Sequence, residues 1–120
     1  MTLNEAVTMR PDFKQKLTSF FKGCKRIHAE YCATHGFEND SKWDMTWLKR
    51  YVRIVVSIDA STRAFVFIDI ETGEVLKTGG WKKPAITKTK RGNIFDERNG
   101  LRHISPYGVS SVNKIKHGPF

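Results

Sequence analysis

The stretch Tyr51-Val-Arg-Ile-Val-Val-Ser-Ile58 decides the fold of this 120-residue chain. Every second residue in it is aliphatic, and the residues between are of mixed character: the aliphatic set is Val52, Ile54, Val56 and Ile58. Successive side chains of a β-strand point to opposite faces of a sheet, so this pattern predicts a strand with one buried face. We therefore expect a sheet at the centre of the molecule, with another element covering that face.

A second candidate strand lies on the N-terminal side of this stretch. Trp43, Met45 and Trp47 alternate with the polar residues Asp44 and Thr46, which favours a strand with one buried face. Because Trp43 and Trp47 are also four residues apart, a short helix remains an alternative.

Two more candidate strands follow on the C-terminal side. Residues 64–70 are apolar on both faces and predict a central strand, after a loop at residues 59–63. Gly73 suits the turn that follows, since it readily takes the left-handed conformation, and residues 75–78 form the next strand. The sequence thus predicts a three- or four-stranded antiparallel meander over about residues 43–78.

A long amphipathic helix is predicted over about residues 11–35. Apolar residues recur there in steps of three and four: Phe13, Leu17, Phe20, Phe21, Cys24, Ile27, Tyr31 and Cys32. Pro11 suits the first helical position, and Gly36 is a typical stop signal. The opposite face carries Lys14, Lys16, Lys22, Lys25 and Arg26, which we interpret as ordinary solvent exposure. Packing of this helix on the meander gives an α+β fold.

The positive charge of the chain is concentrated near its C-terminus. Residues 82–120 hold nine Lys and Arg against two Asp and Glu, within a formal net charge of +9. Glycine, proline and turn signals interrupt any regular pattern from Gly79 onward, as at Pro84 and Asn99-Gly100. The sequence therefore predicts an irregular basic arm, residues 79–120, after the sheet.

Length and composition limit the number of domains and the cellular location that we expect. A chain of 120 residues is enough for a single domain, residues 1–120, and too short for two ordinary ones. No apolar run approaches the length that spans a bilayer, and the N-terminus lacks the order of a signal peptide. We expect no membrane association and a cytoplasmic location.

The basic arm is the best candidate for a binding site. Seven of its cations could neutralise phosphates of a nucleic acid: Lys82, Lys83, Lys88, Lys90, Arg91, Arg98 and Arg102. Lys114 and Lys116 could contribute as well. Trp81, at the start of the arm, could stack on a base, although we favour a role in sealing the edge of the sheet. A module that docks on an acidic protein surface is the alternative function.

A metal site is not expected. Cys24, His28, Cys32 and His35 line up along the predicted helix and are residue types that favour zinc. One straight helix cannot place four ligands around a single ion, and these positions continue the apolar stripe, so we predict packing. On a helix the two cysteines would be about 12 Å apart, too far for a disulfide. No cofactor is expected.

Catalysis is not expected either. Asp69, Glu71, Glu74 and Lys77 have residue types found in metal-dependent nucleases, but they fall at a strand end and in a turn, where polar residues are common. Asn99 and His103 lack the additional histidines that a nuclease motif would need. No glycine-rich phosphate loop precedes a helix.

Several strings in the C-terminal half resemble a group of small uncharacterised proteins of tailed bacteriophages. The most specific are Gly80-Trp81-Lys-Lys-Pro84-Ala85 and Arg91-Gly-Asn-Ile-Phe-Asp96, and the resemblance extends over about residues 50–109. Between these strings the chain has Ile86-Thr-Lys-Thr-Lys90, where such proteins have fewer residues. The resemblance implies a viral origin, with the host cytoplasm or the virion as the location, and supplies no catalytic residues.

Overall fold

The structure, a computed structural model, describes residues 11–85 and 91–109. In this part of the chain a helix comes first and six strands follow: α2 (Phe13–Thr34), β1 (Lys42–Trp47), β2 (Tyr51–Ile58), β3 (Ser61–Asp69), β4 (Val75–Leu76), β5 (Ile104–Ser105) and β6 (Gly108–Val109). The first four strands form one antiparallel sheet in the order β1-β2-β3-β4, and β5 and β6 form a small hairpin. The predicted α+β fold with a four-stranded meander is confirmed.

The register of the sheet resolves the open question about residues 43–47. β1 pairs with β2 so that Met45 lies opposite Ile54 and Trp47 opposite Val52. The short-helix alternative is therefore wrong. The predicted loop at residues 59–63 is wrong for residues 61–63, because β3 begins at Ser61, which pairs with Ile58 across the two-residue turn Asp59-Ala60. Because residues 61–63 are exposed and two of them are small and polar, the sequence pattern did not show that they belong to the strand.

A β-bulge gives β3 its mixed apolar pattern. Ile54 pairs with Val66 and Val55 pairs with Ala64, so Phe65 is an extra residue in β3. Phe65 and Val66 both belong to the core cluster. The buried run from Ala64 to Asp69 confirms that this strand lies inside the sheet, between β2 and β4.

The helix ends as its sequence signals indicate. Gly36 adopts a left-handed φ of 70°, and the N–H groups of Phe37 and Gly36 donate to the carbonyls of Cys32 and Ala33. This pair of bonds is the Schellman motif. At the other end Asp12 is the N-cap, so Pro11 precedes the helix instead of occupying its first position. Within the described residues, no helix combines the length and apolar character needed to cross a bilayer.

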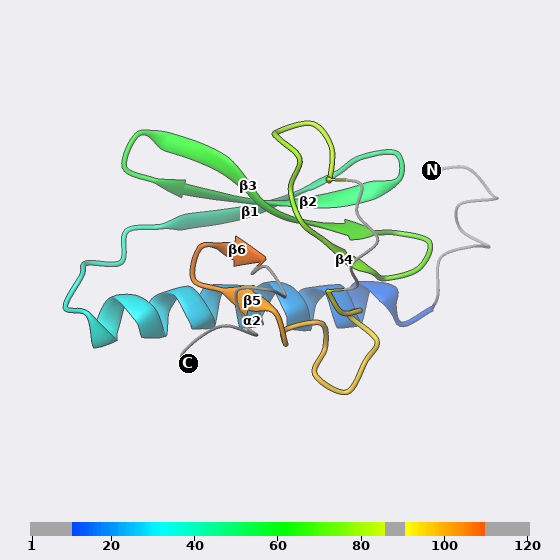
Figure 1. The fold of residues 1–120 in the computed structure, drawn as a ribbon, viewed down its shortest axis with the longest axis horizontal. Coiled ribbons are helices and arrows are strands. Elements are labelled where there is room, and N and C mark those ends of the chain that lie inside the picture. The colour runs from blue at the N-terminus through cyan, green and yellow to red at the C-terminus, as the bar shows by residue number, and fades with distance from the viewer. Residues whose placement is uncertain (1–10, 86–90, 110–120) are drawn as a thin grey trace.

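The helix covers the inner face of the sheet (Figure 1). Its fully buried side chains include Phe13, Leu17 and Phe20, which share one core cluster with Val52 and Ile54 of β2. The amphipathic stripe predicted from sequence is therefore the surface that seals the sheet.

The C-terminal segment is more ordered than the predicted arm. Residues 91–109 pack against both the helix and the sheet, with Ile94 completely buried and Ile104 8% exposed, both in the core cluster. The side-chain amide of Asn99 donates to the carbonyls of Lys16 and Ile94, which ties this segment to the helix. Apart from the short strands β5 and β6, residues 91–109 are irregular, as predicted. Their packing into the core was not predicted, because single apolar anchors produce no periodicity. The tail after residue 109 lies outside the described residues.

The C-terminal segment packs closely against a glycine within the helix. Gly23 is buried, and a Cβ atom added to it would lie 2.5 Å from a methyl carbon of Leu101. Glycine inside a helix costs about 1 kcal/mol relative to alanine. Its place in α2 therefore reflects close approach of the C-terminal segment.

We predict that Ile94→Ala destabilises the whole domain. Truncating a fully buried Ile to Ala typically costs about 2–5 kcal/mol through lost burial and the remaining cavity. Urea unfolding followed by tryptophan fluorescence should show one cooperative transition at lower urea, with an unchanged slope. A second transition, or a loss below about 1 kcal/mol, would mean that residues 91–109 are only loosely attached.

Candidate nucleic-acid interface

A tight loop, residues 77–85, follows β4. The N–H of Gly79 donates to the carbonyl of Lys83, and the N–H of Ala85 donates to that of Lys77, at 3.0 and 2.8 Å. A Cβ atom on Gly79 would lie 2.9 Å from the backbone nitrogen of Ala85, so the two arms of the loop need a glycine there. These contacts fold the chain back on itself and present the tip of the loop, residues 80–82, to solvent.

Trp81 at the tip of this loop is held by Arg53. The guanidinium carbon of Arg53 lies 3.9 Å from the centroid of the Trp81 ring, and its Nη1 donates to the Trp81 carbonyl at 2.8 Å. Arg53 alternates with the core residues Val52 and Ile54, so this stack lies on the outer face of the sheet. The indole remains 44% exposed.

Two of the predicted site residues lie beside this indole. Lys82 and Lys83 follow Trp81 in the loop, and both are exposed. Lys88 and Lys90 lie outside the described residues, and so do Lys114 and Lys116.

The structure does not bring the other predicted cations to this place. Arg91 is only 8% exposed, which differs from the accessible position expected for a phosphate contact. Arg98 and Arg102 are exposed but line a hollow of about 260 Å³ together with the carboxylates of Asp96 and Glu97. Figure 1 places their loop beyond α2, on the opposite side of the molecule from residues 77–85. The predicted site residues therefore do not form one surface. Arg98 and Arg102 lie on a surface that also carries the negative charges of Asp96 and Glu97.

Asp96 organises the loop that carries Arg98 and Arg102. Its carboxylate accepts three backbone N–H bonds, from Gly100, Asn93 and Arg98, at 2.9, 3.0 and 2.9 Å. Partial burial alone would raise the pKa of this carboxyl group. The three donors and the nearby charge of Arg102 outweigh that effect and hold the pKa of Asp96 below its usual value.

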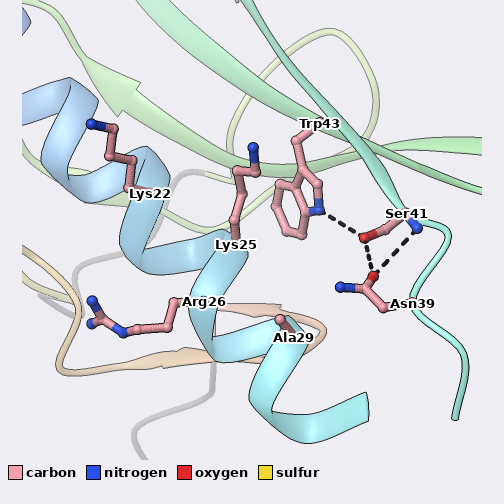
Figure 2. Close-up of a pocket in the computed structure, with 7 residues that line it drawn as sticks. All are labelled: Lys22, Lys25, Arg26, Ala29, Asn39, Ser41 and Trp43. Atoms are coloured by element: carbon pink, nitrogen blue, oxygen red, sulfur yellow. Dashed lines mark hydrogen bonds between the residues drawn. The ribbon is translucent and has the colours of Figure 1, made fainter. Parts of the chain in front are cut away.

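A second basic surface lies between α2 and β1, and we call it the helix groove. It has a volume of about 330 Å³ and is lined by residues of α2, of the segment before β1, and of β1 itself: Lys22, Lys25, Arg26, Ala29, Asn39, Ser41 and Trp43. Figure 2 shows Lys25 beside the Trp43 indole, which comes from β1, while the ends of Lys22 and Arg26 extend from the same helix in the direction away from that ring. The groove thus combines positive charge with an aromatic wall.

The sequence interpretation of these cations as an ordinary solvated face missed this groove. Lys22, Lys25 and Arg26 are spaced three and four residues apart and so lie side by side on the helix. None of them forms an ion pair with a carboxylate in the described part of the chain. The clustering was readable in the sequence, but the facing Trp43 was not, since only the fold places it there.

The residues considered for zinc have other contacts. Cys24 lies in the core, where burial raises the pKa of its thiol well above the usual value. His28 places one ring nitrogen 3.1 Å from the Pro106 carbonyl and the other 3.5 Å from the sulfur of Cys32. Among the described residues, no group of three or more His, Cys, Asp or Glu side chains could hold a metal ion.

The residues considered for catalysis also have structural contacts. Asp69 is buried and accepts N–H bonds from Glu71 and Thr72, and its other oxygen pairs with Arg50 at 3.1 Å. These bonds fix the turn between β3 and β4. His103 is partly buried, and this burial, together with the charges of Arg102 and Arg91, lowers its pKa.

An aromatic cluster lies at the C-terminal end of α2. Tyr31 contacts the rings of His35, Phe37 and Tyr107, with centroids 4.2, 6.0 and 5.3 Å away. Phe37 is 56% exposed and Tyr107 is 61% exposed. Exposed aromatic side chains gathered in this way are typical of interaction surfaces.

Comparison with models of protein families identifies a family for this chain. Residues 6–107 match the model of a family described as a family of unknown function, DUF7717. A search of curated proteins and a search of solved structures each found no match. The match covers most of the chain and supplies no activity.

We predict that Asp96→Asn destabilises the protein at neutral pH by about 1 kcal/mol, because the amide cannot accept all three N–H bonds. Since the folded-state pKa of Asp96 is lowered, its stabilising contribution is present above the unfolded value of about 3.9. That contribution is lost as the pH falls through the folded-state pKa. The difference between wild type and variant in urea unfolding should therefore be larger at neutral than at acidic pH.

Asp40→Asn is the matched control, because Asp40 is exposed and lies in the loop before β1. It should leave the free energy of unfolding unchanged at both pH values. A wild-type to Asp96→Asn difference that stays constant with pH would contradict the role assigned to this carboxylate.

Proposed function

The chain belongs to DUF7717, a family of unknown function, and we propose that it binds single-stranded nucleic acid without strong sequence preference. The contact is made by residues 77–85, and the mechanism is attachment and not catalysis. Proteins of this kind combine cations that follow the phosphate backbone with aromatic rings on which bases stack.

The stack of Trp81 on Arg53 carries this proposal. Arg53 holds one face of the indole, while 44% of Trp81 remains accessible to a partner. The ring is thus positioned before a base arrives, which reduces the entropy lost on binding. The exposed cations Lys82 and Lys83, next in the chain, are suitably placed to meet the phosphates on either side of that base.

The resemblance to tailed-bacteriophage proteins supports a viral setting for this function. In that setting the protein acts in the host cytoplasm or as part of the virion. A high formal net charge of +9 favours fast encounter with any polyanion there.

We predict that the protein binds a fluorescent oligothymidylate of about 16 nucleotides and that affinity falls steeply between about 50 and 200 mM salt. Trp81→Ala should weaken binding by about 5- to 150-fold, the value of one base stack. Lys82→Gln with Lys83→Gln should reduce the slope of log affinity against log salt by about 1.4, for two lost phosphate contacts. Fluorescence anisotropy measures both effects.

Two controls separate these contacts from general effects. Trp81→Phe keeps an aromatic face and should retain most of the affinity. Lys14→Gln with Lys49→Gln removes the same charge from exposed positions elsewhere and should leave the slope nearly unchanged. An absence of binding by the wild-type protein at low salt would refute the proposed function.

The aromatic cluster favours a second candidate function, a protein-interaction module that docks on an acidic protein surface. Phe37 and Tyr107 are the exposed members of the cluster and would be its anchors. We predict that a host lysate treated with nuclease still yields a stoichiometric protein partner. Phe37→Ala with Tyr107→Ala should release it. Loss of every partner after nuclease treatment argues against this function and is what the nucleic-acid proposal expects.

A further inference from the structure

The three cations of the helix groove lie close together on α2, and their mutual repulsion destabilises the helix. Lys22 lies three residues before Lys25 and four before Arg26, and like charges at these spacings repel one another and destabilise a helix. No carboxylate in the described part of the chain forms an ion pair with them. Their positive field is therefore available to an anionic ligand from outside the described part.

The opposite wall of the groove is a tryptophan held in one position. The ring of Trp43 meets that of Phe65 edge to face at a centroid distance of 4.8 Å and that of His28 at 5.8 Å. Its indole nitrogen donates to the Ser41 hydroxyl at 3.0 Å, and that hydroxyl donates to the side-chain oxygen of Asn39 at 2.6 Å. The ring cannot swing out of the groove without breaking this network.

The same network leaves a hydrogen-bond donor at the mouth of the groove. Because the Asn39 side-chain oxygen accepts from Ser41, its amide nitrogen lies on the side facing α2, as Figure 2 shows. Ala29 gives the floor a short side chain, so the space between Trp43 and the helix stays open. A volume of about 330 Å³ is at the lower end of the range of small-ligand sites.

We propose that the helix groove holds one nucleotide unit of a single-stranded nucleic acid. The phosphate lies against Lys22, Lys25 and Arg26, and the base lies beside Trp43 within reach of the Asn39 amide. This inference rests on the proposed function and adds a second contact to it. An acidic peptide would satisfy the cations but has no planar ring for the wall formed by Trp43.

The two contacts can be tested separately because they lie on opposite faces of the sheet. Trp43 pairs with Val56, a core residue, and so faces α2, whereas Arg53 and Trp81 lie on the outer face. Substitutions in the helix groove therefore leave residues 77–85 intact.

The test measures binding of labelled oligothymidylate to two groove variants of the full chain. Lys22→Gln with Lys25→Gln should reduce the salt slope by about 1.4. Ala29→Leu fills the groove while keeping every charge and a good helix former, and should weaken binding at least tenfold. Lys14→Gln with Lys49→Gln, on exposed positions outside the groove, should bind as wild type does. Circular dichroism confirms that each variant is folded.

Three results would overturn the inference while leaving the proposed function standing. One is wild-type affinity and salt slope in both groove variants. Another is an effect of the lysine substitutions with none from Ala29→Leu, which would reduce the groove to a diffuse positive field. A third is equally tight binding of a poly-glutamate peptide that both variants lose, which would identify an acidic protein surface as the ligand. Failure of the wild-type protein to bind the oligonucleotide at low salt overturns both.

Discussion

The whole structure depends on closing the inner face of a four-stranded sheet that a single helix cannot cover alone. The helix supplies Phe13, Leu17 and Phe20, and the remaining area is sealed by Ile94 and Ile104 from the far end of the sequence. Full burial of one such aliphatic side chain contributes about 1.5–3 kcal/mol. The C-terminal segment approaches α2 so closely that Leu101 occupies the space that a side chain at position 23 would need, which explains the glycine there.

This use of the C-terminal segment determines where the positive charge appears. Because residues 91–109 pack against α2 and the sheet, the loop that carries Arg98 and Arg102 lies beyond α2, on the opposite side of the molecule from Lys82 and Lys83 (Figure 1). Between α2 and β1 the packing leaves the helix groove, and its three cations form no ion pair with a carboxylate of the residues that the structure describes. The cations that form one basic arm in the sequence are therefore separated in space. The helix cations Lys22, Lys25 and Arg26, which we interpreted as solvent-exposed, line a groove together with Trp43.

Much of the fold was predictable because its main elements have strong periodicity. The alternation in Tyr51–Ile58 and the three- and four-residue steps from Phe13 to Cys32 each bury one continuous face. Segments anchored by isolated residues were not predictable, since Ile94 and Leu101 belong to no repeating pattern. For the candidate site, the exposed Lys82 and Lys83 were identifiable, but the stacking of Arg53 on Trp81 and the position of Trp43 arise only from strand register and tertiary contacts.

The short β4 strand and its loop also determine how much of the sheet edge is open to another chain. A sheet edge with free N–H and C=O groups is a template for pairing with another chain. Here β4 has only two residues, and the backbone groups of Lys77 and Gly79 just beyond it bond to Ala85 and Lys83 within the loop. At the opposite edge, β1 carries Lys42 and Asp44. Both margins of the sheet are therefore poor templates for pairing with a strand of another chain.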